Sequence, residues 1–163
     1  MVKVQRFSIT MPPRTLAQVA ARQARPEDEQ STDRSSVIAK SLDRYFYALD
    51  SARRALRSRL SEGEQGLILD ALNGTLFSEP FSVGIIEHEI ADAIADGYAE
   101  KWQVDGPALV EKLTALSYCE KLAIVDAAER WWNRVARGEQ PAVGEMLDYP
   151  RTSGRMERSH DVG

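Results

Sequence analysis

The sequence of 163 residues is 43% hydrophobic and 28% charged, a composition typical of a globular protein with room for one domain or two small ones. It contains no apolar run near the roughly 20 residues that a membrane-spanning helix needs and no apolar secretory core, so we expect a cytoplasmic protein. The single cysteine, Cys119, excludes an internal disulfide and a cysteine-based zinc site, and His88 and His160 lie too far apart in sequence to suggest a metal pair. We therefore expect no metal and no cofactor.

The net charge of −4 hides an uneven distribution along the chain. Residues 1–60 contain 12 Lys or Arg and 6 Asp or Glu, whereas residues 61–163 contain 9 Lys or Arg and 19 Asp or Glu. A basic first segment followed by an acidic body indicates that the first segment meets a polyanion and that the second does not.

The first expected element is a β-strand at residues 3–11, KVQRFSITM. From Arg6 onward polar and apolar side chains alternate strictly, which is the pattern of a strand with one buried face. The rest of the chain shows no second strand, and a lone strand would leave a row of backbone donors and acceptors unpaired. We therefore expect the same strand of a second copy to pair with it. The apolar face of the strand consists of Phe7, Ile9 and Met11.

Two helices are expected after the strand. Pro12 and Pro13 end the strand pairing and open a helix that continues to about Ala24. A polar, acidic linker follows, and Thr32 or Asp33 can cap a second, long helix that extends to about residue 59. The apolar face of this second helix consists of Ile38, Leu42, Tyr45, Leu49, Ala52 and Leu56.

The outer end of the second helix, at residues 51–60, is basic and is expected to connect two domains. A run of charge on a helix is most simply a solvated face, and a second DNA contact is the alternative. We therefore expect solvent around its four arginines, Arg53, Arg54, Arg57 and Arg59.

The strand, the prolines, the short helix and the segment RSSVIAKSLDRY together resemble the ribbon-helix-helix family of bacterial DNA-binding proteins, of the Arc, MetJ and CopG type. The resemblance covers roughly residues 3–50. It implies a mainly α fold in which one strand and two helices form an obligate dimer. The chain departs from the family pattern in a longer turn between the helices and in Arg14-Thr15, where acidic residues are common. The implied dimer core consists of Phe7, Ile9, Met11, Ile38 and Leu42.

On the opposite face of the paired strands, the dimer would present Arg6, Ser8 and Thr10 twice. A two-stranded ribbon fits the major groove of B-DNA, where each base pair shows its own donor and acceptor pattern. Arg6 can form two hydrogen bonds to guanine, and by the resemblance all three side chains are base-reading positions. The alternative is that they are the solvated face of an edge strand. The expected phosphate contacts are Lys3, Arg14, Arg34, Ser35 and Ser36, the last three at a helix start that attracts anions.

From residue 61 the pattern changes to four expected helices with short connections, which form a small acidic domain at residues 61–147. Two of the helices begin with the spacing of a capping box, and a third begins at a serine. Residues 148–163 lack periodicity, and we expect a disordered tail there. The four helices are expected from Ser61 to Leu72, from Ser82 to about Trp102, through Leu109, Leu113 and Leu116, and from Ser117 to Gly138.

Two features of the acidic domain suggest chemistry but have simpler interpretations. Glu87, His88 and Glu89 point in different directions on a helix, so we expect a surface histidine rather than a metal site. Trp131 and Trp132 cannot share one helix face, so we expect one of them in the core. The other is most simply in the core or partly exposed, and an oligomer interface or a ligand pocket is the alternative.

The expected function is sequence-specific DNA binding by a homodimer that acts as a transcriptional repressor on double-stranded DNA. An enzyme is not expected, because the sequence shows no nucleophile with a base, no metal set and no phosphate loop. The acidic domain could build higher oligomers or bind a protein partner or an effector. Two alternatives are the antitoxin of a toxin–antitoxin pair and a plasmid segregation or DNA-transfer accessory factor. The resemblance implies a cytoplasmic protein that is associated with the bacterial nucleoid or encoded by a plasmid or phage.

Overall fold

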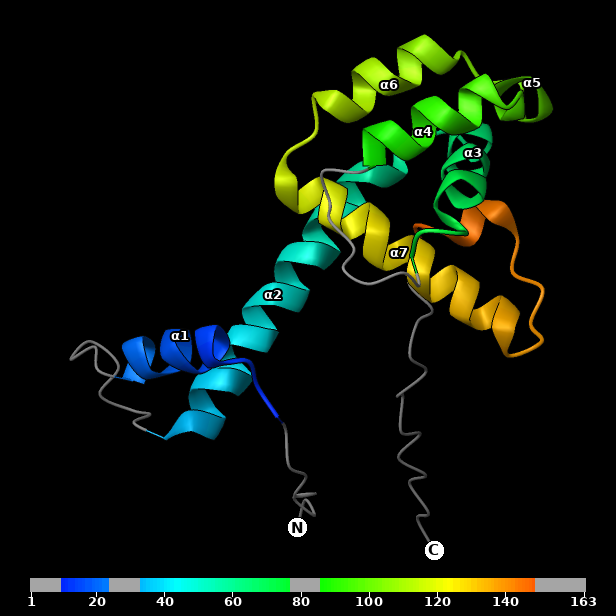
Figure 1. Ribbon diagram of the computed structural model, residues 1–163. Helices are drawn as coiled ribbons and strands as arrows, with labels where there is room; N and C mark the ends of the chain where they lie inside the picture. The colour runs from blue at the N-terminus through cyan, green and yellow to red at the C-terminus, as the bar shows by residue number, and fades with distance from the viewer. Residues whose placement is uncertain (1–9, 24–32, 77–85, 149–163) are drawn as a thin grey trace, which may run out of the picture. The chain divides into compact units, whose positions relative to one another are not determined.

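The computed structural model of the chain describes residues 10–23, 33–76 and 86–148. Within these ranges the chain is mainly helical, with seven α-helices and no strand (Figure 1). This confirms a mainly α fold. The expected strand lies outside the described residues except for Thr10 and Met11, which have no strand structure. The chain divides into two compact units, which we name the N-terminal unit, up to Tyr47, and the C-terminal unit, from Ala48 onward.

The N-terminal unit contains helix α1 (Pro13–Gln23) and the first part of helix α2 (Arg34–Arg57). Helix α1 opens on a proline, which is tolerated at a helix start because no helical partner is lost there. Both helices begin and end within two residues of the expected positions. Among the described residues of this unit, only Val19 and Val37 are buried apolar side chains, at 9% and 5% exposure.

The C-terminal unit has its own apolar core. Its fully buried side chains include Leu56, Leu67, Ile90, Leu113 and Ile124. Helix α3 contacts α4, α5 and α7 as well as the 3-10 turn η2, so it lies at the centre of the packing. The elements after α2 are α3 (Glu62–Leu72), α4 (Ile86–Ala95), α5 (Tyr98–Trp102), α6 (Gly106–Thr114), α7 (Tyr118–Ala136) and η2 (Val143–Glu145).

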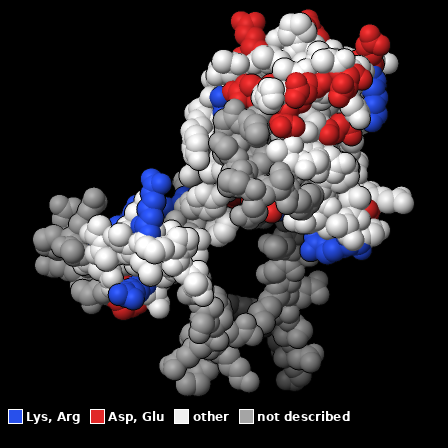
Figure 2. Space-filling model, viewed as in Figure 1, with Lys and Arg blue, Asp and Glu red and all other residues white. Residues whose placement is uncertain are grey.

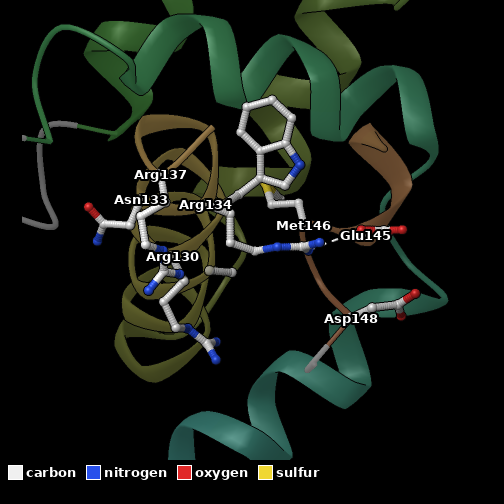
Figure 3. Close-up of a pocket in the computed structure, with 9 residues that line it drawn as sticks. Arg130, Asn133, Arg134, Arg137, Glu145, Met146 and Asp148 are labelled. Atoms are coloured by element: carbon white, nitrogen blue, oxygen red, sulfur yellow. Dashed lines mark hydrogen bonds and ion pairs between the residues drawn. The ribbon is translucent and has the colours of Figure 1, made fainter. Parts of the chain in front are cut away.

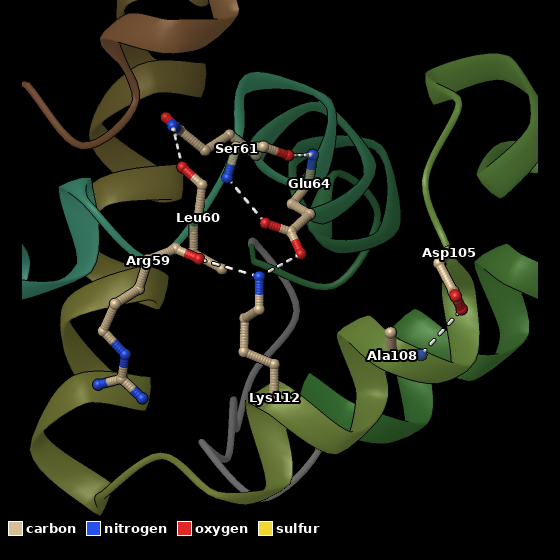
Figure 4. A network of polar contacts seen from close by, with 8 residues as sticks. Arg59, Leu60, Ser61, Glu64, Asp105, Ala108 and Lys112 are labelled. Atoms are coloured by element: carbon tan, nitrogen blue, oxygen red, sulfur yellow. Dashed lines mark hydrogen bonds and ion pairs between the residues drawn. The ribbon is translucent and has the colours of Figure 1, made fainter.

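Both expected capping boxes are confirmed. Ser61 Oγ accepts the backbone N–H of Glu64 at 3.2 Å, and the Glu64 carboxylate accepts the backbone N–H of Ser61 at 2.7 Å (Figure 4). The same reciprocal pair joins Ser117 and Glu120 at the start of α7. Each box satisfies two backbone donors that have no partner within the helix, and therefore fixes where the helix begins.

A lysine joins the first of these boxes to the end of α2. Lys112 Nζ, from α6, donates to the carbonyl oxygen of Arg59 at 2.9 Å and to Glu64 Oε1 at 2.5 Å (Figure 4). The C-terminal end of a helix carries partial negative charge, so a cation close to it is favourable. Lys112 thereby holds α2, α3 and α6 together at one corner of the C-terminal unit.

A close approach of backbone and indole ring packs α3 against α5. A Cβ atom at Gly66 would lie 2.5 Å from the ring of Trp102, so no side chain fits at this position. Trp102 Nε1 donates to Asp70 Oδ2 at 2.7 Å, and Lys101 donates to the same oxygen at 2.7 Å. Glycine at position 66 is therefore a packing requirement.

The expectation of one continuous helix from Ser82 to Trp102 is wrong, because the described part of this stretch forms two helices. Gly97 separates α4 from α5 and has a φ angle of 87°, a left-handed conformation that glycine adopts without steric cost. The described part of the C-terminal unit therefore has five α-helices after α2 instead of four. The expected cap, Ser82, lies outside the described residues.

The expectation that solvent surrounds the four arginines of residues 51–60 is wrong at Arg53, whereas the expected apolar face of this stretch is buried. Leu56 and Leu60 are buried in the core of the C-terminal unit. Arg53 is only 5% exposed, and its Nη1 donates to the carbonyl oxygen of Leu147 at 2.8 Å. The guanidinium also pairs with Asp50 at 3.2 Å. Arg54, Arg57 and Arg59 are exposed, as expected.

The two adjacent tryptophans of α7 are both half-buried, and both pack against the core of the C-terminal unit. Their ring centroids lie 4.9 Å apart with planes at 85°, an edge-to-face pair. Trp131 Nε1 donates to the carbonyl oxygen of Ala142 and Trp132 Nε1 to that of Leu69, both at 3.0 Å. The pair therefore ties α7 to α3 and to the segment after α7.

Within the described ranges, every helix is too short or too polar to cross a lipid bilayer.

The cap of α7 predicts an acid dependence of stability. The pKa of Glu120 lies below its usual value of 4.5, chiefly because its carboxylate accepts the backbone N–H of Ser117, with Arg59 adding attraction. A carboxyl with a lowered pKa stabilises the folded state above its unfolded pKa, and the contribution is lost as pH falls through the folded value.

We expect the free energy of unfolding to fall below about pH 4.5, and to fall less steeply in Glu120→Gln. Urea unfolding followed by tryptophan fluorescence at a series of pH values measures this slope. Glu129→Gln is the matched control, because Glu129 is an exposed carboxylate on the same helix. Equal slopes for Glu120→Gln and the unchanged chain would contradict the role of the cap.

Candidate nucleic-acid interface

The structure describes only part of the expected DNA-binding surface. Thr10, Arg14, Arg34 and Ser35 are exposed, and Ser36 is half-buried. Of the expected dimer core, Met11 and Ile38 are half-buried and Leu42 is exposed. The remaining expected residues, Lys3, Arg6, Phe7, Ser8 and Ile9, lie outside the described residues.

The start of α2, where a phosphate contact is expected, is capped by the chain itself. Asp33 Oδ1 accepts the backbone N–H of Ser36 at 2.9 Å, and Asp33 Oδ2 accepts the Ser36 hydroxyl at 2.8 Å. The hydrogen bond from the backbone N–H of Ser36 is the main reason why the pKa of Asp33 is lowered. Both donors of Ser36 are thus engaged by a carboxylate, whereas the side chains of Arg34 and Ser35 remain exposed.

Two exposed basic residues of α2 were not singled out from the sequence. Lys40 and Arg44 are four residues apart and therefore share one side of the helix. They lie away from the apolar face that contains Leu42, because Lys40 precedes Leu42 by two residues and a helix turns by about 100° per residue. Their signal in the sequence is the pair of basic residues four positions apart in the segment RSSVIAKSLDRY.

The two units differ in charge. The described part of the N-terminal unit contains five Lys or Arg and two Asp or Glu, whereas that of the C-terminal unit contains ten and seventeen. In the C-terminal unit most basic side chains are paired with a carboxylate, for example Lys101 with Asp70. Figure 2 shows acidic side chains gathered over one part of the C-terminal unit. The local charge therefore favours a polyanion only at the N-terminal unit.

An apolar face of α2 is open to solvent within the N-terminal unit. Leu42, Tyr45 and Phe46 are 46%, 41% and 49% exposed, and Leu16 on α1 is 42% exposed. The rings of Tyr45 and Phe46 form an edge-to-face pair with centroids 5.4 Å apart. We name Leu16, Leu42, Tyr45 and Phe46 the open apolar face.

The same helical spacing continues to Leu49 and Leu56, which belong to the C-terminal unit and are 4% and 0% exposed. The second part of the apolar face of α2 is therefore covered within one chain, and the first part is not.

A metal site is not formed by the described residues, since no three of their His, Cys, Asp and Glu side chains come together. Comparisons of the chain with protein-family models, with curated proteins and with solved structures found no match.

Proposed function

We propose that the chain is a sequence-specific DNA-binding homodimer whose DNA-binding part is a ribbon-helix-helix formed by residues 3–50 of two copies. The observation that carries this proposal is the open apolar face of the N-terminal unit, together with the small number of buried apolar side chains in the described part of that unit. Val19 and Val37 are the only buried apolar side chains in its described part. A segment of this size cannot bury enough apolar surface to be stable alone, so it needs a partner.

A second copy of the same segment is the occupant that fits best. Fully burying a large apolar side chain stabilises a fold by about 1.5 to 3 kcal/mol, and symmetry doubles each contribution in a dimer. Leu42, Tyr45 and Phe46 follow one another at helical spacing, so two such helices can pack side by side. The paired strands at residues 3–11 would then be the second part of the shared core.

The charge of the N-terminal unit supports DNA as the ligand. Arg14, Arg34, Lys40 and Arg44 are exposed, and an exposed cation close to a phosphate contributes the salt-dependent part of affinity. Sequence reading is assigned to Arg6, Ser8 and Thr10 of the paired strands, which would lie in the major groove. Ser36 is assigned a smaller role than the sequence suggested, because Asp33 already accepts both of its hydrogen bonds.

Within this proposal the chain acts as a transcriptional repressor. The C-terminal unit has a core and two capping boxes of its own, whereas an antitoxin usually carries a short segment that folds on the toxin. A self-sufficient second unit therefore favours the repressor over the antitoxin.

Arg6→Ala should weaken binding to the specific site far more than binding to random DNA. The lost pair of hydrogen bonds to guanine corresponds to about 1 to 3 kcal/mol of discrimination. Fluorescence anisotropy with a duplex recovered by selection from a random library, and with a scrambled duplex of equal length, measures both affinities.

Arg14→Ala is the matched control for Arg6→Ala. As a phosphate contact it should weaken binding to both duplexes alike and reduce the dependence of log K on log salt by about one. An equal loss on both duplexes for Arg6→Ala would remove Arg6 as a base reader. If selection recovers no preferred sequence, sequence-specific binding itself is contradicted.

A further inference from the structure

An asparagine followed by a glycine, Asn73 and Gly74, lies at the end of helix α3 in the C-terminal unit. Asn73 is the C-cap residue of the helix, and both residues are exposed. A Cβ atom at Gly74 would meet no atom within 4 Å, so the surroundings of this glycine are open. The pair therefore brings an unshielded backbone nitrogen next to a side-chain amide.

These two groups can react with each other. The backbone nitrogen of Gly74 attacks Cγ of Asn73, and the side-chain NH2 group leaves with the proton of that nitrogen as ammonia. The product is a five-membered cyclic imide, which water opens at either of its carbonyl carbons to give aspartate or isoaspartate. A side chain on the residue after the asparagine hinders the attack, and glycine has none.

The structure distinguishes this pair from two aspartate–glycine pairs that could form the same imide. Gly97 donates its backbone N–H to the carbonyl oxygen of Ile94 at 3.0 Å, so its nitrogen is engaged. Asp105 accepts the backbone N–H of Ala108 at 3.1 Å, so its carboxylate is held by the cap of α6. An ionised carboxylate is also a poorer electrophile than a side-chain amide. By contrast, no acceptor among the described residues binds the N–H of Gly74.

The second asparagine of the sequence, Asn133, is an internal control. It lies within α7 and borders a pocket that Trp131 and Met146 also line (Figure 3). It is exposed, as Asn73 is, but the next residue is Arg134, whose side chain is held by two carboxylates. Because the helix continues past Asn133, its backbone angles are fixed on both sides.

The end of α3 is held less firmly. Asn73 has helical angles, with φ of −53° and ψ of −43°, and closing the imide ring requires rotation about ψ. The last turn must therefore open, which breaks the hydrogen bonds from the N–H groups of Thr75 and Leu76 to the carbonyl oxygen of Leu72, both 3.1 Å long. Helix ends open at a small free-energy cost. The reaction is thus slower than in an unfolded chain but accessible to the folded one.

We propose that Asn73 and Gly74 form a site of spontaneous covalent modification, at which the folded chain loses ammonia and gains a carboxylate. The new charge lies at the C-terminal end of α3, where the partial negative charge of the helix makes an anion unfavourable. Isoaspartate also adds a methylene group to the backbone, so the turn after the helix cannot re-form as before. Since α3 contacts α4, α5 and α7, the modification destabilises the C-terminal unit, and it does so independently of DNA binding.

Incubation of the full chain at mildly alkaline pH, followed by tryptic peptide mapping with mass spectrometry, measures the conversion of each asparagine. Asn73 and Asn133 are in different tryptic peptides, because Lys101 and Arg130 lie between them. We expect Asn73 to be converted at least about tenfold faster than Asn133, with isoaspartate among the products. Methylation by an isoaspartyl methyltransferase detects this product. Equal rates at the two asparagines, or aspartate without isoaspartate, would overturn the proposed site.

Gly74→Ala should slow the conversion of Asn73 by at least about tenfold, because the added Cβ shields the backbone nitrogen. Gly144→Ala is the matched control, since a Cβ there would lie 3.7 Å from Glu62, an ordinary contact, and far along the sequence from Asn73. An unchanged rate in Gly74→Ala, or an equal decrease in Gly144→Ala, would also overturn the proposed site. The converted chain, separated by ion exchange, should unfold at a lower urea concentration than the fresh chain, and an equal midpoint would contradict the effect on α3.

Discussion

In the proposed dimer, Leu42→Glu should cause dissociation to monomers and abolish the proposed specific DNA binding. Leu42 is 46% exposed within one chain, so a glutamate there meets water in the monomer and should leave its helices intact. In the proposed dimer it would place two carboxylates in an apolar interface. If each costs about 2 kcal/mol, the dissociation constant of the dimer rises by roughly a thousandfold. Sedimentation equilibrium measures the dimer, and anisotropy with the selected duplex measures DNA binding.

Tyr47→Glu is the matched control for Leu42→Glu. Tyr47 is 71% exposed and follows Leu42 by five residues, which places it roughly 140° around the helix from Leu42. It introduces the same charge into the same helix, so it should leave the dimer and its DNA affinity within about threefold of the unchanged chain. A stable Leu42→Glu dimer, or equal dissociation in both variants, would rule out the open apolar face as the dimer interface.

Gly66→Ala should destabilise the C-terminal unit by about 1 to 3 kcal/mol, even though alanine is the better helix former. The added Cβ would lie 2.5 Å from Trp102, whose ring is held by its hydrogen bond to Asp70. The ring cannot move away without losing that bond or its packing on α3. Urea unfolding followed by tryptophan fluorescence measures the free energy of unfolding.

Gly74→Ala is the control for Gly66→Ala, because a Cβ at Gly74 would meet no atom within 4 Å. It should change the free energy of unfolding by less than about 0.5 kcal/mol. A double variant with Trp102→Leu should lose part of the penalty of Gly66→Ala, since the clashing ring is gone. Equal effects of the two glycine substitutions would mean that the approach of Trp102 does not limit position 66.

Local signals predicted most of the helix starts of the C-terminal unit. Serine followed three residues later by glutamate, at Ser61 and Ser117, is a complete local device, because both hydrogen bonds form within one turn. The apolar spacing of Leu109 and Leu113 likewise predicted their burial. Such features depend on neighbours in sequence and are therefore readable without a structure.

The features that were missed depend on contacts between distant residues or on a single backbone angle. Arg53 was expected in solvent because of its charge, but its partner is a carbonyl group 94 residues away. Gly97 fits a helical pattern by its spacing, and only its left-handed conformation shows that the helix ends there. For the candidate interface, the sequence predicted the apolar face of α2 but could not show that its first part, with Leu42, stays uncovered within one chain.

The position of Trp131 and Trp132 in the C-terminal unit has a practical consequence. The chain has three tryptophans, and the third, Trp102, also belongs to the C-terminal unit. Tryptophan fluorescence therefore reports on the C-terminal unit alone. The open apolar face of the N-terminal unit contains Tyr45 and Phe46 but no tryptophan. Loss of helical circular dichroism without a change in indole emission would accordingly be a spectroscopic signature of the N-terminal unit melting alone. A strong dependence of that first transition on protein concentration would identify it as dissociation coupled to unfolding.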